Sequence, residues 1–431
     1  MSTPPLLFRD ARLVDPASGL DARGALLVRE GRIADLLPGE ARPAAPDGAI
    51  EVDCAGLVLA PGLIDMRVFT GEPGAAHKET LASAARAAAA GGITTIVVMP
   101  RTDPVIDEAP LVDFVLRRAR DTAIVNVLPM GALTKGLEGE TMAEIGLMQE
   151  AGAVAFTDAD RSVADSAVMR RALSYARTFD ALICHHAEDP GLARLGVMNE
   201  GELSTRLGLF GIPHAAETIT LQRDLALVEL TGARYHLAQM SSRASLPVLE
   251  AARARGLPVS AAVSAAHLAL NENDIAGYRT FFKTSPPLRE EDDRAALADA
   301  LARGTIDVVV SCHDPQAPED KRVPFSEAAT GAVGLETLLP VLLGLVLEGT
   351  LSLSRALETV TAAPARLLGL EAGRLARGAP ADLVLIDPEC PYTLTAAELQ
   401  SRSRNTPFDG RRFQGRAMRT FVAGREVFER G

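Results

Sequence analysis

The sequence predicts an α/β protein built on a parallel sheet, with a β-rich part contributed by both ends of the chain. In the middle of the chain, strand-like apolar runs alternate with helical runs, and such repeats are typical of a parallel sheet. At both ends the pattern changes to short alternating segments joined by Gly, Asp and Ser, which are typical of hairpins. A doubly wound sheet is the alternative, but no GxGxxG motif opens a helix after the first strand, so the dinucleotide-binding version of that fold has no support.

Composition narrows the class of protein. The 431 residues are 47% hydrophobic, enough to bury a large core, and the formal net charge is −12. No run of Lys and Arg appears, so nucleic acid and anionic membranes are disfavoured as partners. Neither a disulfide framework nor a zinc ribbon is expected, because no CxxC pair occurs among the four distant cysteines Cys54, Cys184, Cys312 and Cys390.

Targeting signals are not apparent in the sequence. The segment MSTPPLLFRDAR lacks the apolar core of a signal peptide, and the longest apolar stretch, Leu338–Leu347, is too short to cross a bilayer. We therefore expect a cytoplasmic protein in a reducing compartment.

The expected elements follow in order along the chain. Hairpin-like strands are expected in LLFRDARLVD and GALLVREGRIADLLP, and again in ADLVLIDPECPYTL and AMRTFVAGREVFE. Pro61 and Gly62 break the chain before Leu63–Phe69, which reads as a short buried strand with polar residues at its end. The helix Glu79–Ala90 ends at two glycines and precedes the strand ITTIVVMP. Later strands and helices repeat this step: the strand DTAIVNVLPMGAL, the helix around Thr141–Ala151 and AVAFTDAD, the helix Ser166–Phe179 and ALICHHAED, the helix Glu217–Thr231 and RYHLAQMSS, and the helix Ala244–Gly256 and PVSAAVSAAHL.

Several motifs resemble one family. The stretch Ala60–Gly74, APGLIDMRVFTGEPG, resembles the first barrel strand of the amidohydrolase superfamily, and most closely that of the type I bacterial dihydroorotases, where it usually runs PGLIDMHVHLREPG. Further segments resemble dihydroorotases in the same order: MPRTDPVID, GVMNEGELSTRLGLFGIPHAAE, FKTSPPLR, VPFSEAATGAVGLET, PARLLGL and NTPFDG. The resemblance implies an amidohydrolase-type (β/α)8 TIM barrel over residues 58–364, and a small β-sandwich domain built from residues 1–57 plus 365–431.

The resemblance also implies a set of metal-ligand positions. Dihydroorotases open or close a cyclic amide with one or two zinc ions, which polarise the carbonyl and deliver a bound hydroxide. Only two positions keep a family ligand, Asp158 and His186. The other four positions hold a permanent cation, a ring without a lone pair, an amide that is a poor zinc ligand, and a thiol in place of the aspartate base: Arg67, Phe69, Gln239 and Cys312.

These replacements predict that the protein has no resident metal and no competent base. The register at Cys312 rests on counting back from Lys321, and Asp314 is the alternative base if the register slips. Cys312 is expected to act as a small buried hydrophobe. If the chain is nevertheless active, zinc is the expected cofactor.

The substrate pocket that the resemblance implies is altered as well. Gly71 stands where the family has an arginine for the substrate carboxylate, and Arg101 stands where it has an asparagine. Only His267 remains of a family pair of histidines. Arg67 also belongs to this set, and we expect it to pair with Asp158, replacing the metal charge by an internal salt bridge.

The remaining candidates have structural interpretations. His185 and His186 are neighbours, so on a strand they face opposite sides, and one of them is expected to be structural. His236 lies three residues from Gln239 and is expected to be a packed core histidine. The acids that follow the histidine pair, Glu188 and Asp189, are expected to cap the next helix or to form ion pairs.

Three functions remain open. The first is a dihydroorotase-like pseudoenzyme of de novo pyrimidine biosynthesis, a homodimer that serves as a structural or regulatory partner of aspartate carbamoyltransferase, as the resemblance implies. The second is an active zinc-dependent dihydroorotase or other cyclic amidohydrolase with a rebuilt metal site that uses Asp158, His186 and Cys312. The third is a small-molecule binding module in which Arg67 and Arg101 receive an anion. The apolar helix after VGLET is the candidate dimer contact.

Overall fold

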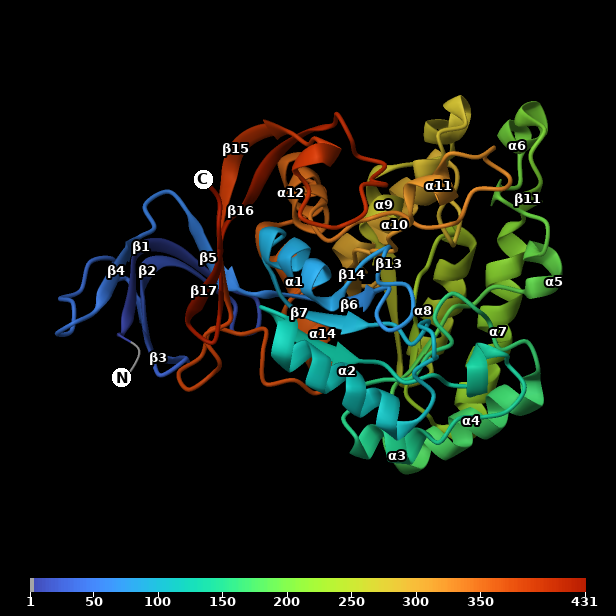
Figure 1. Ribbon diagram of the computed structural model, residues 1–431, viewed down its shortest axis with the longest axis horizontal. Coiled ribbons are helices and arrows are strands. Elements are labelled where there is room, and N and C mark those ends of the chain that lie inside the picture. The colour runs from blue at the N-terminus through green and yellow to red at the C-terminus, as the bar shows by residue number, and fades with distance from the viewer. Residues whose placement is uncertain (1–3) are drawn as a thin grey trace.

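The computed structural model describes residues 4–431, so the first three residues of the expected 1–57 segment lie outside the described residues. Figure 1 shows a β-rich domain on the left, with both chain ends, beside a barrel surrounded by helices. The strands are β1 Leu6–Asp15, β2 Leu20–Arg29, β3 Arg32–Pro38, β4 Ile50–Asp53, β5 Val58–Pro61, β6 Leu63–Val68, β7 Ile93–Val98, β8 Asn126–Pro129, β9 Ile183–His185, β10 Met198–Asn199, β11 Gly211–Ile212, β12 Tyr235–Leu237, β13 Val259–Ser264, β14 Val308–Val310, β15 Leu383–Thr393, β16 Arg412–Val422 and β17 Arg425–Glu429.

The α-helices connect these strands. They are α1 Leu81–Ala90, α2 Ala109–Thr122, α3 Ile145–Glu150, α4 Ser166–Thr178, α5 Pro190–Ala193, α6 Glu202–Leu207, α7 His214–Thr231, α8 Leu246–Ala254, α9 Ala265–Ala269, α10 Glu291–Arg303, α11 Pro318–Lys321, α12 Leu338–Leu347, α13 Leu353–Glu358 and α14 Ala362–Leu368. Within residues 4–431, none of the helices is long and apolar enough to cross a membrane.

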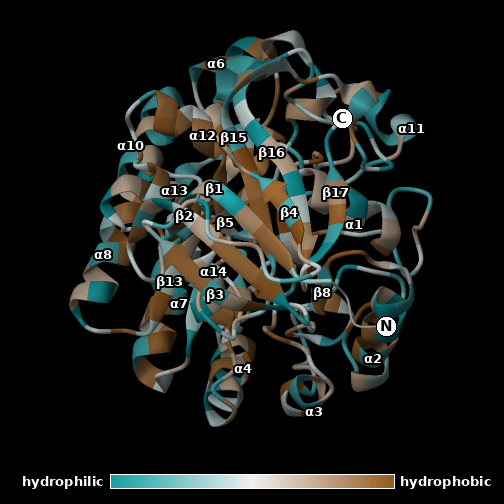
Figure 2. Ribbon diagram, turned by 90° about the vertical axis from the view of Figure 1, so that its left-hand side faces the viewer, coloured by the Kyte–Doolittle hydropathy of each residue, from teal (hydrophilic) through white to brown (hydrophobic). Residues whose placement is uncertain are grey.

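The small domain combines both ends of the chain, as expected. Its sheet has the order β17-β16-β15-β5-β1-β2-β3, and β4 also pairs with β1. The two ends meet where β5 pairs antiparallel with β15, and Figure 2 shows the apolar strands of this domain facing the viewer. The domain has its own apolar core, separate from the core of the barrel. In this core Phe8 packs edge-on against Phe421, with ring centroids 4.9 Å apart.

The barrel is closed by parallel pairing. One arc is β6-β7-β8 and the other is β9-β12-β13-β14. Phe156 bridges the arcs on one side, pairing with Gly131 and Ile183, and Val68 pairs with His313 on the other. The expected TIM barrel is confirmed, although the segment AVAFTDAD contributes an isolated bridge at Phe156 instead of a regular strand.

Gly62 separates the two domains. β5 belongs to the small-domain sheet, and β6 begins the barrel after this single residue. A Cβ at Gly62 would lie 2.2 Å from the side chain of Thr94, so the close approach requires glycine. The break at Pro61 and Gly62 therefore marks the passage from one sheet to the other.

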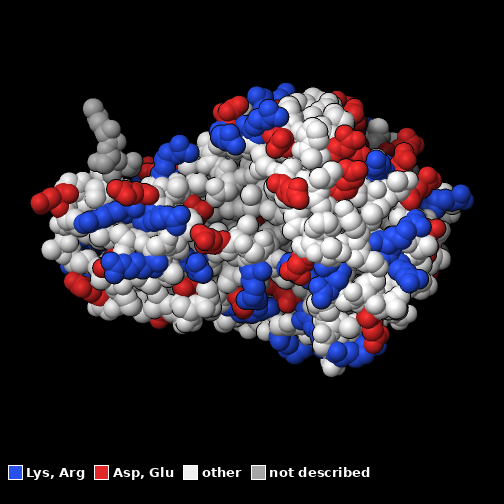
Figure 3. All heavy atoms as spheres, turned by 90° about the horizontal axis from the view of Figure 1, so that it is seen from below, with Lys and Arg blue, Asp and Glu red and all other residues white. Residues whose placement is uncertain are grey.

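The helices mostly follow the expected ranges, with shifted ends. α1 starts at Leu81, after Thr80 forms a capping box with Ser83, and most of its residues are buried. α7 starts at His214, three residues before the expected Glu217. The apolar helix α12 is largely buried within the chain, where it packs against β16, so the protein's own core accounts for its apolar character. On the face that Figure 3 shows, Lys and Arg lie among Asp and Glu.

Candidate functional site

Most of the predicted site residues line two neighbouring cavities at the ends of barrel strands, whereas His186 lines a separate hollow with Asp160 and Glu188, and Asp158 lines none of these three cavities. A cavity there is lined by side chains from several of these strands and from the loops that follow them, including Arg67, Phe69, Gln239, His267, Cys312 and Asp314. A neighbouring hollow is lined by Phe69, Gly71 and Arg101, among others. The carboxyl ends of barrel strands are where this fold places its ligand sites.

Arg67 lies at the centre of this region, on β6. Its side chain is buried, one guanidinium nitrogen, Nη2, donates to the carbonyl of Ala159 at 3.0 Å, and Nε has no partner. Within the described residues, no carboxylate lies within 4 Å of the guanidinium. A buried cation without a counter-ion is costly, which sets Arg67 apart from the other arginines of the site.

Asp158 does not neutralise Arg67. Its carboxylate accepts hydrogen bonds from the amides of Leu133, at 3.0 Å, and Thr134, at 2.9 Å, and from the Thr134 hydroxyl. Burial nevertheless raises the pKa of this carboxyl. The expected salt bridge between Arg67 and Asp158 is therefore wrong, because backbone donors of the preceding loop take up the carboxylate.

Arg101 is already neutralised. Its guanidinium pairs with Asp160 and, at 2.8 Å, with Asp314. The ring of Phe69 lies between two guanidinium groups, 4.2 Å from that of Arg101 and 5.4 Å from that of Arg67. The expectation that Arg101 receives an anion together with Arg67 is wrong for this arrangement, since two carboxylates already hold Arg101.

The loop at Gly71 is closed on itself. A Cβ at Gly71 would lie 2.0 Å from the carbonyl oxygen of Ala75, whose amide donates back to the Gly71 carbonyl. No side chain fits at this position unless the loop changes its path.

Gln239 and Cys312 contact each other. The Gln239 amide nitrogen donates to the Cys312 sulfur, while the Gln239 carbonyl oxygen is buried without a partner. Burial raises the pKa of the Cys312 thiol to about 12, so the sulfur stays protonated near neutral pH. Cys312 is partly buried, packs against an apolar cluster and also lines the cavity, so the expectation of a small buried hydrophobe holds in part.

Asp314 and His267 are both engaged by neighbours. Asp314 accepts from Arg101 and, at 2.9 Å, from the side-chain amide of Gln316. His267 contacts the Ser264 hydroxyl at 2.6 Å and the Pro287 carbonyl at 3.1 Å, and burial lowers its pKa to about 4. The carbonyl can only accept, so the histidine Nε2 carries the proton there.

The histidines at the end of β9 differ sharply. His185 Nδ1 donates to Asp224 at 2.6 Å, and the amide of Val163 donates to its Nε2 at 2.9 Å, which makes it the structural member of the pair. Neither ring nitrogen of His186 has a hydrogen-bond partner, although Glu188 lies 3.6 Å from its Nε2.

The other residues with structural interpretations behave as expected. His236 is buried against the Ser260 hydroxyl at 2.8 Å, and burial lowers its pKa to about 3. Asp189 caps α5 by accepting from the amides of Gly191 and Leu192.

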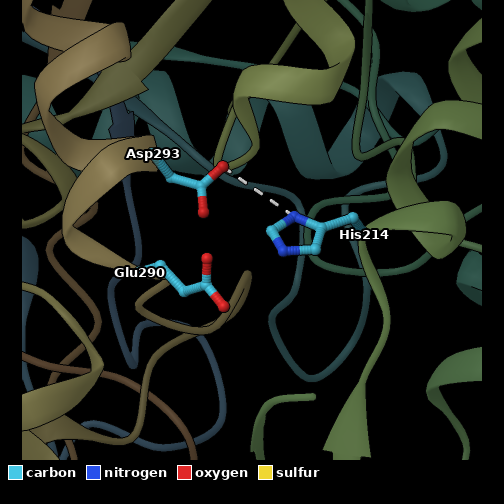
Figure 4. Close-up of side chains that lie close together, drawn as sticks. All are labelled: His214, Glu290 and Asp293. Atoms are coloured by element: carbon cyan, nitrogen blue, oxygen red, sulfur yellow. Dashed lines mark ion pairs between the residues drawn. The ribbon is translucent and has the colours of Figure 1, made fainter. Parts of the chain in front are cut away.

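A cluster of polar residues outside these cavities has no counterpart among the residues that the sequence predicts for the site. His214, Glu290 and Asp293 bring one ligand atom each to within 4.8 Å of one another (Figure 4). They come from the starts of α7 and α10, more than seventy residues apart in the chain. The one sequence signal was the spacing of three between Glu290 and Asp293, which places both on one face of a helix start.

Comparisons with known proteins agree on one family. A family model described as dihydro-orotase-like matches residues 56–245, and one described as amidohydrolase family matches residues 344–428. A dihydroorotase of Anaeromyxobacter dehalogenans is 46% identical over 99% of this chain and 98% of that protein, and one of Pelobacter propionicus is 44% identical over 99% and 100%. Among solved structures, L-hydantoinase from Arthrobacter aurescens matches with a TM-score of 0.88 at 25% identity, covering 100% of this chain and 97% of that one. Dihydropyrimidinase from Brevibacillus agri shares the fold, with a TM-score of 0.84 at 22% identity over 99% and 95%.

Proposed function

Because the chain belongs to the dihydroorotase family of the amidohydrolase superfamily, we propose that it is a non-catalytic member of that family that serves pyrimidine biosynthesis. The observation that carries this proposal is the buried guanidinium of Arg67. It occupies the strand position that the family resemblance assigns to a zinc-binding histidine, and a guanidinium group offers donors only and no lone pair to a metal ion.

We call the end of the barrel where Arg67, Gln239 and Cys312 line the cavity the barrel mouth. The donor set there does not fit the family's zinc centre. A hydrolytic zinc site takes about three protein ligands with free lone pairs, at about 2 Å from the ion. Of the assigned positions, Asp158 is held by donors of its own chain, and Gln239 and a protonated Cys312 contact each other. His186 alone offers an unpartnered imidazole.

We further propose that the protein acts through a partner, aspartate carbamoyltransferase, and as a homodimer. The partner is suggested by the family resemblance. Exposed apolar side chains on neighbouring segments around α5 and β11, Leu192, Leu195 and Phe210, offer a surface that suits protein contact. Co-purification of the two full-length proteins tests the partner, and replacing Phe210 and Leu195 with Ser is expected to weaken the complex.

A dihydroorotase assay with metal analysis tests the central proposal. We expect no turnover of dihydroorotate or carbamoyl aspartate above the blank, with or without added Zn²⁺. Turnover that His186→Gln or Asp314→Asn abolishes contradicts the proposal. The assay uses the wild-type protein beside Glu290→Gln, so that metal bound at the surface is not mistaken for metal in the barrel.

An active cyclic amidohydrolase is the second candidate. The names of the curated relatives favour it, because proteins 42–46% identical to this chain are called dihydroorotase. It requires that His186 binds zinc and that Arg67 leaves its present position. A hydantoin substrate included in the same assay distinguishes a changed substrate from lost catalysis.

An anion-binding module is the third candidate, and the missing counter-ion of Arg67 favours it. Thermal unfolding with orotate, dihydroorotate or inorganic phosphate tests it. We expect a rise in melting temperature in the wild type and none in Arg67→Met if an anion binds there. An equal rise in both proteins rules out binding at Arg67.

A further inference from the structure

We propose that His214, Glu290 and Asp293 form a binding site for a divalent transition-metal ion, Zn²⁺ or Mn²⁺, which joins the start of α7 to the start of α10. The proposal is independent of the function assigned to the barrel mouth. The three ligand atoms lie within 4.8 Å of one another. Bonds of about 2.0–2.2 Å to Zn²⁺ place tetrahedral ligand atoms about 3.4 Å apart, so closing the set takes side-chain shifts of only about 1 Å.

Asp293 supplies the strongest indication of a ligand. Its side chain is completely buried, and one carboxylate oxygen, Oδ2, has no hydrogen-bond partner. The other oxygen accepts from the amide of Arg243 at 2.8 Å and lies 3.8 Å from Nδ1 of His214. Buried carboxylates in proteins are paired, hydrogen-bonded or bound to a metal, and this oxygen lacks the first two partners.

The free atoms point to one place. In Figure 4 the dashed line joins Asp293 to Nδ1 of His214, while its second oxygen, an oxygen of Glu290 and the other ring nitrogen of His214 face the space between the three side chains. Nδ1 of His214 lies 2.7 Å from the Ser242 hydroxyl. A proton on Nδ1, donated to that hydroxyl, leaves the lone pair of Nε2 free, and this is how metal-bound histidines are usually oriented.

The local charge favours a cation. Within residues 4–431, neither Glu290 nor Asp293 pairs with a lysine or arginine. The guanidinium of Arg243 pairs with Asp292 at 2.6 Å, and that of Arg289 donates to Asn199, Ser241 and the Ile212 carbonyl. The two carboxylates therefore face the imidazole without an ion pair to lysine or arginine, and the guanidinium groups of Arg243 and Arg289 act on them only at longer range.

Acidic residues are also common at helix starts, where the helix dipole stabilises them. That effect explains exposed Asp292 and Glu291 in the first turn of α10. The helix dipole does not explain why the buried Oδ2 of Asp293 has no hydrogen-bond donor. A mixed imidazole and carboxylate set suits Zn²⁺ or Mn²⁺ better than Mg²⁺ or Ca²⁺, and the partly exposed His214 leaves one side open to water.

Metal titration of the full-length protein, stripped with a chelator, tests the site. Isothermal titration with Zn²⁺ gives the stoichiometry and affinity, and Co²⁺ absorption reports the coordination. We expect one equivalent in the wild type and at least about a tenfold loss of affinity in both Glu290→Gln and Asp293→Asn. The matched control is Asp292→Asn, a charge change on the same helix turn outside the cluster, which is expected to bind as the wild type does.

Each alternative outcome is decisive. Asn keeps the acceptor for the Arg243 amide and Glu290 is partly exposed, so both variants are expected to fold. No uptake by the wild type overturns the proposal, and so does equal affinity in wild type, Glu290→Gln and Asp293→Asn. Uptake that is lost in His186→Gln but kept in Glu290→Gln places the metal at the barrel mouth. That result overturns this site and also contradicts the proposed function. If the metal binds at His214, Glu290 and Asp293 but the protein turns over dihydroorotate, only the proposed function is contradicted.

Discussion

Two adjacent histidines at the end of β9 meet opposite surroundings. Both are buried, but His185 has a partner for each ring nitrogen, whereas His186 has none. Asp224, the partner of His185, also accepts from Tyr235 at 2.8 Å and from Arg223 at 2.6 Å. Folding alone accounts for a satisfied network of this kind, which fixes how α7 packs on the barrel.

The barrel mouth resembles His186, because several of its buried polar atoms lack hydrogen-bond partners. Unpartnered polar atoms gather there on Arg67, His186 and Gln239. Buried polar groups without partners cost free energy, so these positions are not explained by stability. The difference separates residues that hold the fold from residues that are kept for a ligand or remain from a former one.

The largest expected effect comes from breaking the satisfied network. Replacing Asp224 with Ala leaves the Arg223 charge, His185 and Tyr235 without their shared acceptor, and should lower the free energy of unfolding by about 3–5 kcal/mol. Urea denaturation measures this. Asp180→Asn, at an exposed ion pair with Arg234, is the control and should cost about 1 kcal/mol or less. Equal losses in both variants would show that the buried network around Asp224 contributes no more to stability than an exposed ion pair.

The next effect concerns pH. Burial lowers the pKa of His236 to about 3 and that of His267 to about 4, against an ordinary value of about 6.5 in the unfolded chain. The unfolded state therefore binds more protons below pH 6.5, and stability is lost as the pH falls toward 4, by about 1.4 kcal/mol per pH unit for each histidine.

A variant isolates the contribution of one histidine to the change of stability with pH. His267→Gln should show a shallower loss of stability between pH 6.5 and 4.5 than the wild type, measured by urea denaturation at each pH. Asp65 acts in the opposite direction, because burial raises its pKa to about 6, so the wild-type curve alone is not diagnostic. A slope that is unchanged in His267→Gln would mean that this imidazole can be protonated in the folded protein.

A smaller effect, of opposite sign, is expected at Arg67. Replacing it with Met removes a buried charge that lacks a counter-ion and keeps most of the volume, so the free energy of unfolding should rise by about 1–2 kcal/mol. Arg101→Met is the matched control and should destabilise, because Asp160 and Asp314 lose their partner. Denaturation in a buffer free of phosphate and carboxylates measures both, and a loss of stability in Arg67→Met would show that the guanidinium is well solvated or paired.

The smallest effect is expected at His186. His186→Gln removes no hydrogen bond and should change the free energy of unfolding by less than about 1 kcal/mol. Chemical denaturation beside His185→Gln provides the contrast, since that variant disturbs the bond to Asp224. A large loss at His186 would place it with the residues that hold the fold.

The sequence was sufficient to predict the architecture and the region of the site. The alternating segments at both ends indicate the small-domain sheet, because the periodicity of side chains reports burial directly. The boundary expected between residues 57 and 58 falls before β5, whereas β5 pairs with β1 and β15 in the small-domain sheet. The start of α7 was misplaced because Pro213, which precedes it, is not a side-chain capping residue.

The directions of site side chains were harder to predict. Asp158 turns toward the amides of Leu133 and Thr134, and nothing in its neighbouring residues signals that choice over Arg67. The cluster at His214 depends on two helix starts that only the folded barrel brings together. Such long-range contacts leave no local pattern in a single sequence.

The pairing of β5 with β15 also sets an order of events during synthesis. Residues 58–61 leave the ribosome more than three hundred residues before their partners at 383–386. The edge of β5 that pairs with β15 therefore stays unpaired while the whole barrel is synthesised. A ribosome stalled before residue 383 would carry a chain whose barrel can close but whose first sheet cannot, and that exposed edge is where a chaperone would be needed.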